Sequence, residues 1–287
     1  MDVFYATTAD GIELALHRFA ARGRRRAVCL CTHAMMANSR YLTLGPENGF
    51  AGYLAQNGVD TFLLDFRGHG LSRPPLSRVH SHWCFDHYVE YDLPAAVAAV
   101  CDAAGIEASQ LVYSGHSLGG LVGLAAVGTG AIRPPRAIAL WATSVWLTGA
   151  RGSRRRRLAM KLYDLASRPL GRAPIRALRF GSNDEPRGYV AQLAEWSRTG
   201  RWLSRDGVDY LASLNNIRTR SWGACGTGDR LCQPSDARVL LSRLTGSERL
   251  RQVGIRCGYA LDADHFGLVT RRELLPLWRE FFEFFAS

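Results

Sequence analysis

The chain has 287 residues, 47% of them hydrophobic, so it can bury a large core as one α/β domain or two small ones. No apolar run follows its first residue, and no stretch approaches the roughly 18 uninterrupted apolar residues of a membrane span. Its seven cysteines include no CxxC pair, and several lie in apolar strand-like runs. We therefore expect free thiols and a reduced, cytoplasmic setting.

The first half of the chain alternates strand and helix patterns at short spacing. In chain order, we expect two hairpin strands (4–7 and 12–18), a buried strand (27–32), a helix (50–56), a buried strand (61–65), a long helix (85–104), and strands at 111–113 and 136–141. This order is typical of a parallel α/β sheet.

The alternation breaks between residues 146 and 216, where the sequence predicts helical patches and no clean strand. The expected elements of the second half are helices at 158–166 and 190–197, a strand at 221–225, a helix at 235–244, a strand at 254–261 and a final helix at 271–285. We therefore expect one core domain of residues 1–145 and 217–287, interrupted by a helical insertion of residues 146–216.

Residues 111–120 read Leu-Val-Tyr-Ser-Gly-His-Ser-Leu-Gly-Gly and contain the pattern G-x-S-x-G around Ser117. An apolar strand precedes the pattern and an Ala-rich helical segment follows it, as in a nucleophile elbow. Flanking glycines leave room for the sharp turn, and the helix N-terminus favours developing negative charge. The plain alternative is a tight Gly-rich turn with a capping serine.

A serine nucleophile needs a histidine base and an acid that orients the base, and in this context both follow the serine in chain order. Asp229 follows the strand at 221–225, and His265 comes just before the last helix. Both positions fall in loops after strands, where ligands of open α/β sheets bind. The rival acids are Asp236, Asp262 and Asp264, while His116, next to the serine, is interpreted as a packing residue.

An oxyanion hole needs two preorganised backbone donors. We expect one from the N–H of Leu118, the residue after the nucleophile, and one from the loop after the strand at 27–32, at Met35. The alternative for residues 33–36 is an ordinary loop packed by methionines. No metal-ligand spacing, phosphate loop or dinucleotide fingerprint occurs, so we expect no metal and no cofactor.

These motifs together resemble the α/β-hydrolase fold superfamily over nearly the whole chain outside the insertion. The motifs that support the resemblance are His33-Ala34-Met35-Met36, Asp65-Phe66-Arg67-Gly68-His69-Gly70-Leu71-Ser72, Gly115-His116-Ser117-Leu118-Gly119-Gly120, Gly226-Thr227-Gly228-Asp229 and Asp264-His265-Phe266-Gly267. The segments 33–39 and 83–95 are further similar to the acid lipase branch. The resemblance implies Ser117, Asp229 and His265 as a catalytic triad, Met35 and Leu118 as oxyanion donors, and the insertion as a helical cap. One departure is Ala34, where the superfamily usually has glycine.

The excess positive charge is concentrated in the insertion, since residues 151–205 hold 13 Arg and one Lys against four acids. Three interpretations stay open: a solvated surface, a docking face for an anionic partner such as a membrane surface, an acyl carrier or a CoA-like substrate, and a nucleic-acid site. We do not expect nucleic acid, because no recognisable module accompanies the charge. Trp196 and Trp202 are interpreted instead as apolar lining of an acyl pocket.

The sequence thus favours a serine hydrolase that cleaves carboxylic esters of a small-molecule substrate through an acyl-enzyme on Ser117. The first alternative is an acyltransferase or thioesterase that uses the same triad on a CoA- or carrier-bound acyl group. A second alternative is a non-catalytic protein of this fold that binds an apolar ligand. An intact Ser/Asp/His set argues against that alternative.

Overall fold

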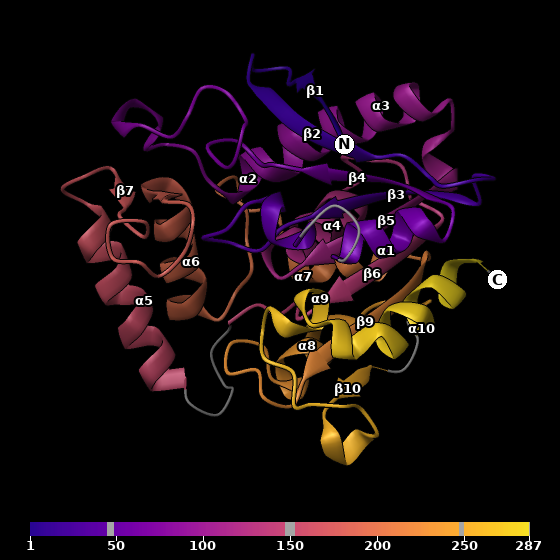
Figure 1. The fold of residues 1–287 in the computed structure, drawn as a ribbon. Helices are drawn as coiled ribbons and strands as arrows, with labels where there is room; N and C mark the ends of the chain where they lie inside the picture. The colour runs from indigo at the N-terminus through magenta and orange to yellow at the C-terminus, as the bar shows by residue number, and fades with distance from the viewer. Residues whose placement is uncertain (45–48, 147–152, 247–249, 287) are drawn as a thin grey trace.

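A mostly parallel β-sheet forms the centre of the computed structural model, which describes residues 1–44, 49–146, 153–246 and 250–286 (Figure 1). In these ranges the sheet has eight strands in the order β1-β2-β4-β3-β5-β6-β9-β10. The antiparallel pairs are β1–β2 and β2–β4, and the remaining pairs are parallel. The strand bounds are β1 Asp2–Thr7, β2 Glu13–Phe19, β3 Ala27–Thr32, β4 Val59–Leu64, β5 Leu111–His116, β6 Ala137–Trp141, β9 Arg220–Gly226 and β10 Arg251–Val253.

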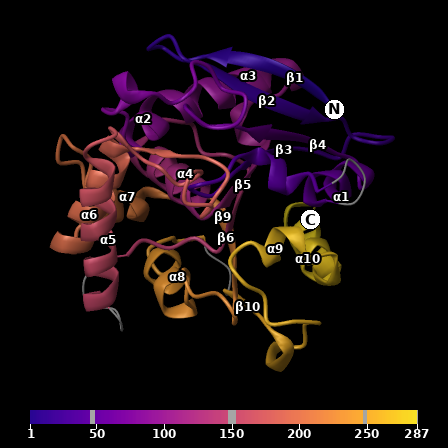
Figure 2. The same ribbon diagram turned by 60° about the vertical axis from the view of Figure 1, so that its left-hand side comes forward.

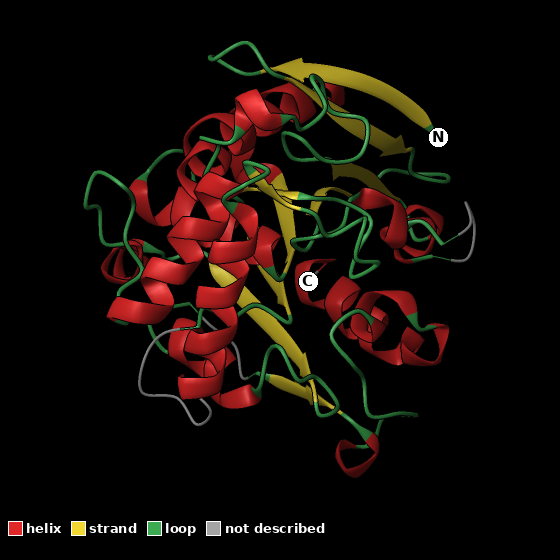
Figure 3. Ribbon diagram, turned by 90° about the vertical axis from the view of Figure 1, so that its left-hand side faces the viewer, coloured by secondary structure: helices red, strands yellow, loops and turns green. Residues whose placement is uncertain are grey.

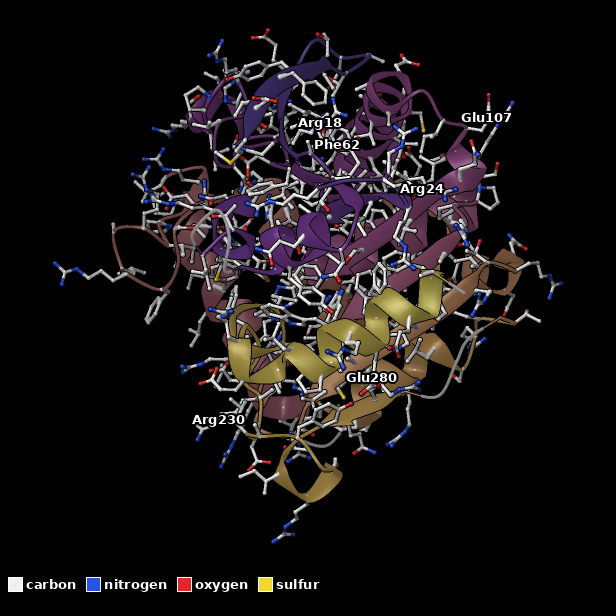
Figure 4. The ribbon with its side chains drawn as sticks, turned by 45° about the vertical axis from the view of Figure 1, so that its right-hand side comes forward. Arg18, Arg24, Phe62, Glu107, Arg230 and Glu280 are labelled. Atoms are coloured by element: carbon white, nitrogen blue, oxygen red, sulfur yellow. The ribbon has the colours of Figure 1, made fainter. Side chains whose placement is uncertain are left out.

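The central strands are apolar on both faces, because helices cover both faces of a parallel sheet. Every residue of β4, β5 and β6 is buried. At the antiparallel end, Arg18 of β2 donates two hydrogen bonds to Asp60 at the start of β4, and its guanidinium lies 5.4 Å from the ring centroid of Phe62 (Figure 4). These contacts support the register between β2 and β4.

Helices α3 and α4 pack in one apolar cluster on one face of the sheet, and α1 and α10 pack in a second cluster on the other face (Figure 1). Helix α4 is almost wholly buried, which explains its uniformly apolar sequence. The helix bounds are α1 Phe50–Gln56, α2 Phe85–His87, α3 Leu93–Ala104, α4 Leu118–Thr129, α5 Ser153–Ser167, α6 Arg187–Thr199, α7 Tyr210–Ser213, α8 Pro234–Leu241, α9 Gly267–Thr270 and α10 Leu275–Ala286. None of the helices in the part described is long and apolar enough to cross a membrane.

Between β6 and β9 the chain forms α5, α6 and α7 together with two short strands, β7 at Arg172–Ala173 and β8 at Glu185–Pro186. Helices α5 and α6 lie side by side at the edge of the molecule (Figure 2), and Figure 3 shows the helices of this segment in front of the sheet. The two predicted helices of the insertion are therefore present, and the β7–β8 pair is an addition that the sequence pattern did not predict. Arg151, the first cation of the basic segment, lies outside the described residues.

Two predicted elements differ from the structure. The prediction of a strand at residues 254–261 is wrong. The strand here is β10, which ends at Val253, and a short 3₁₀ turn at Ile255–Cys257 follows it. Gly254 and the left-handed Gly258 bracket this turn, and the exposed residues between them have no sheet to pair with. The long helix expected at residues 85–104 is interrupted by a π-helical turn at Tyr88–Asp92, where Asp92 turns inward to bind Arg67.

Candidate active site

Ser117 lies on a sharp turn between β5 and α4, with φ 53° and ψ −110°. A left-handed φ is strained for serine, and such strain is concentrated at functional sites. The following glycines allow close packing of the turn: a Cβ at Gly119 would collide with Thr32 at the end of β3, and one at Gly120 with Thr143 in the loop after β6. The strand–turn–helix context predicted for the G-x-S-x-G pattern is therefore present, and it presents Ser117 to a pocket.

Asp229 and His265 are in hydrogen-bond contact across 36 residues of sequence. Oδ2 of Asp229 lies 2.8 Å from Nδ1 of His265, and Oδ1 accepts hydrogen bonds from the backbone N–H groups of Leu231 (2.7 Å) and Cys232 (2.9 Å). The buried carboxylate is thus fixed by three donors. An Asp that accepts from Nδ1–H leaves the Nε2 lone pair of the imidazole free to take a proton.

The three rival acids are engaged elsewhere. Asp236 forms an ion pair with Arg156 and accepts a hydrogen bond from the N–H before α8. Asp262 accepts from the hydroxyl of Thr227, and Asp264 accepts from the N–H of Gly267. Of the four candidates, the structure places only Asp229 in hydrogen-bond contact with His265.

The two residues expected to supply oxyanion donors line the same pocket as Ser117. Leu118 is the first residue of α4, where a helix offers no acceptor for its own N–H groups, and Met35 is in the loop after β3. The Gly119 N–H donates to the carbonyl oxygen of His33 at 3.1 Å, which ties this loop to the elbow. Met35, Leu118, Ser117 and His265 all line one pocket, and the buried Ala34 lines it too.

His116 connects the two loops that flank the serine. The N–H of Ala34 donates to the Tyr41 hydroxyl (2.9 Å), so the hydroxyl proton is free to bond Nδ1 of His116 (2.7 Å), and Nε2–H of His116 donates to the carbonyl oxygen of His265 (2.9 Å). Burial, followed by the neighbouring His265, lowers the pKa of His116 well below its usual value, which keeps the ring neutral. His116 is therefore more than the packing residue that the sequence suggested.

A second connection to the loop after β3 comes from Glu185 of β8. Its Oε1 accepts the N–H of Met36, which has a left-handed φ of 60°, and lies 3.2 Å from Nε2 of His69. Both side chains of the Glu185–His69 pair are fully buried. Burial lowers the pKa of His69, but the Glu185 carboxylate outweighs this effect and raises it. Sequence reasoning missed Glu185; the available signal was an acid within an otherwise basic segment.

The pocket above Ser117 has a volume of about 420 Å³ and is lined mainly by apolar side chains. The core supplies one wall, including Leu121, Val145 and Phe266, and residues 146–216 supply the other. The lining residues within 146–216 are Trp146, Met160, Phe180, Gly181, Ser182, Tyr189, Leu193 and Trp196.

The expectation for the two tryptophans holds for Trp196 alone. Trp202 is buried away from the pocket against Tyr210, with ring centroids 5.5 Å apart. Among the described residues, no group of three His, Cys, Asp or Glu side chains is placed to hold a metal ion.

Known proteins share parts of this sequence and the whole of this fold. A family model described as serine aminopeptidase, S33 matches residues 23–253. The tear acid lipase-like protein of Mesocricetus auratus is 30% identical over 139 residues, which are 44% of this chain and 34% of that protein; the gastric triacylglycerol lipase of Homo sapiens is 29% identical over 138 residues, with the same coverage. The matched region spans about a third of the length of these relatives.

Two solved esterases superpose on almost the full chain. The thermophilic esterase of Thermogutta terrifontis has a TM-score of 0.66 at 16% identity, covering 100% of both chains, and the esterase of Exiguobacterium antarcticum has a TM-score of 0.63 at 14% identity, covering 99% of both. At these identities the likeness shows the fold, and it confirms the predicted α/β-hydrolase architecture. With a family match over most of its length, the chain belongs to the serine aminopeptidase S33 family of α/β hydrolases.

Proposed function

We propose that this hydrolase cleaves carboxylic esters with an apolar acyl group through an acyl-enzyme on Ser117. The observation that carries the proposal is the position of Ser117 and His265 in the lining of one apolar pocket, with Asp229 bonded to the far side of the imidazole. A site that only bound a ligand would not require a strained serine at a helix N-terminus.

Each group has a defined step in this mechanism. Nε2 of His265 takes the proton of the Ser117 hydroxyl while the serine oxygen attacks the ester carbonyl, and Asp229 stabilises the imidazolium. The N–H groups of Leu118 and Met35 stabilise the tetrahedral oxyanion. The imidazolium then protonates the leaving alcohol, and water, deprotonated by His265, releases the acid from the serine.

The pocket favours an ester over an amino-terminal peptide, although the family model takes its name from an aminopeptidase. An aminopeptidase must bind a cationic α-amino group next to the scissile bond. The described residues that line this pocket include neither Asp nor Glu. An uncompensated ammonium group in such a pocket would be strongly unfavourable, whereas an alkyl or aryl chain would be stabilised.

We also propose that the insertion of residues 146–216 acts as a cap that shapes the acyl site. Met160 of α5, Leu193 of α6 and Phe180 between them face the pocket opposite the core wall. The acyl chain would therefore lie between the cap and the core, and the cap would determine which chains fit.

The test is covalent labelling by a fluorophosphonate probe, with Ser117→Ala as the test variant. The control is Ser144→Ala, because Ser144 lines the same pocket but is not on the turn. We expect Ser117→Ala to abolish labelling and Ser144→Ala to retain it; undiminished labelling of Ser117→Ala would overturn the assignment.

The substrate class is tested with aryl esters of increasing chain length, an amino-acid anilide and an acyl-CoA, each with and without an alcohol acceptor. The proposal expects ester hydrolysis that needs no acceptor. Faster turnover of the anilide, of the thioester or of transfer to the alcohol would replace it with peptidase, thioesterase or acyltransferase chemistry.

A further inference from the structure

The outer face of α5 carries an apolar stripe that faces water. Leu158, Leu162 and Leu165 are 58%, 56% and 55% exposed, and their spacing of four and three residues places them on one side of the helix. A helix at a protein surface normally presents polar residues on this side. Adjacent exposed leucines of this kind are typical of an interaction site.

These leucines take no part in packing α5 against the rest of the molecule. The opposite side of the helix is the packed one: Met160 lines the pocket, Tyr163 packs beside the cluster of Ala173, Ile175 and Val190, and Arg156 pairs with Asp236 of α8. Figures 1 and 2 both show α5 at the edge of the molecule, beside α6. The helix therefore has one apolar side facing the protein and a second facing solvent.

Cations surround the exposed leucines. Arg154, Arg155, Arg157 and Lys161 are all exposed, and none of them forms an ion pair with another described residue. An apolar stripe bordered by unpaired cations is complementary to an anionic lipid surface, where charged headgroups lie directly above acyl-chain hydrocarbon. An anionic protein partner would have to supply an apolar groove in addition to its negative charge.

Three further exposed apolar side chains follow α5 in the sequence, and one of them lines the pocket. Leu170 and Leu178 are about half exposed, and Phe180 is 75% exposed while it also lines the pocket. The residues that would meet a lipid surface are therefore close in sequence to the residue at the pocket mouth.

We propose that the outer face of α5, extended by Leu170, Leu178 and Phe180, docks this protein on an anionic lipid surface. The leucines and Phe180 insert between headgroups, and the four cations contact lipid phosphates. Docking itself depends on this surface alone. The consequence that an apolar ester enters the pocket directly from the lipid rests on the proposed function.

The experiment measures sedimentation of the full-length protein with vesicles of phosphatidylcholine, with and without phosphatidylglycerol, at low and high salt. The Ser117→Ala variant is used throughout, so that docking is measured without turnover. We expect strong binding to the anionic vesicles, weak binding to the neutral ones, and a decrease at high salt because exposed charges are screened.

Two variants separate the apolar and the ionic contributions. Leu158→Ser/Leu162→Ser/Leu165→Ser should weaken binding at least 10-fold at either salt concentration. Replacing the four cations by Gln should weaken binding at low salt by a similar or larger factor, since each is worth about five-fold near an anionic surface. The matched controls are Val3→Ser/Val208→Ser/Ile255→Ser, which are exposed apolar residues elsewhere, and Gln replacements of Arg133, Arg136, Arg243 and Arg256; they should bind as the parent does.

Three outcomes would overturn the proposal. They are equal binding of the parent and the leucine variant, a dimer in light scattering that the leucine variant abolishes, and saturable binding of an acidic acyl carrier that vesicles do not displace. Failure of the proposed function is a separate result, because undiminished fluorophosphonate labelling of Ser117→Ala would overturn that function and leave the vesicle-binding result as it is.

Discussion

Replacement of Glu185 by Gln tests whether the buried carboxylate of this β8 residue stabilises the fold and the loop after β3. The amide oxygen can still accept the hydrogen bond from the N–H of Met36, but a neutral amide cannot stabilise protonated His69. Because both members of this pair are fully buried, loss of one partner falls in the range of a broken buried ion pair. We therefore expect the free energy of unfolding to fall by about 3 kcal/mol.

The pH dependence of this difference identifies its cause. The folded state raises the pKa of His69 above the unfolded value of about 6.5. The pair therefore adds its full contribution to the free energy of unfolding below about pH 6.5, and this contribution is lost as the pH rises through the folded pKa. Urea unfolding at a series of pH values should thus show the largest difference between the wild type and Glu185→Gln near pH 6. The difference should shrink in alkaline solution.

The matched control is Glu195→Gln on α6, whose carboxylate is exposed and pairs with Arg198. An exposed pair of this kind is worth at most about 1 kcal/mol. If Glu185→Gln is as stable as Glu195→Gln, or if its deficit grows with pH, the ionic account of the pair is refuted. A larger change, Glu185→Ala, should also lower kcat by up to about 100-fold with little change in KM, because the loop that holds an oxyanion donor loses its anchor.

Three further predictions concern the site. Tyr41→Phe removes the hydroxyl between Ala34 and His116, and should reduce the free energy of unfolding by about 1–3 kcal/mol and lower kcat; an unchanged kcat would remove Tyr41 from the positioning network. Burial is the main reason that the pKa of His33 is lowered to about 3. The free energy of unfolding should therefore fall as the pH drops from about 6.5 toward 3, by at most about 4 kcal/mol from this group. Equal midpoints of urea unfolding at pH 7 and pH 4 would contradict this. Leu193→Trp should fill the cap side of the pocket, lowering kcat/KM for long-chain aryl esters more than for the acetyl ester, and an equal loss for both would place the acyl chain elsewhere.

The elbow and the acid–base pair could be predicted because their signals are local in sequence. Glycines around a serine, a preceding apolar strand and polar residues at strand ends each have a direct physical reason, and Ser117, Asp229 and His265 were identified from them. The same logic failed at residues 254–261, where a short strand ends at Val253 and an apolar pattern continues into a turn.

The supporting contacts could not be predicted, because they join residues far apart in the chain. Met36 and Glu185 are separated by 149 positions, and Tyr41 and His116 by 75. Glu185 is one of few acids in a strongly basic segment, and a solvated ion pair is the natural interpretation of such an acid. Its burial depends on the β7–β8 pair, which consists of two-residue strands without a periodic signal.

Two ion pairs join the segment between β6 and β9 to the rest of the molecule, and they constrain how ligands enter and leave the pocket. Arg156 ties α5 to Asp236, and Glu185 ties β8 to His69. Swinging the whole segment outward would break both pairs, and a cost of a few kcal/mol limits such an open state to about 0.1–10% of molecules. Rotation of the exposed Phe180 ring at the pocket mouth breaks neither pair, and side-chain rotations of this kind take picoseconds to nanoseconds. Under the proposed function, ligand exchange past this side chain would be fast relative to turnover, and acyl transfer to and from Ser117 would be the slow step.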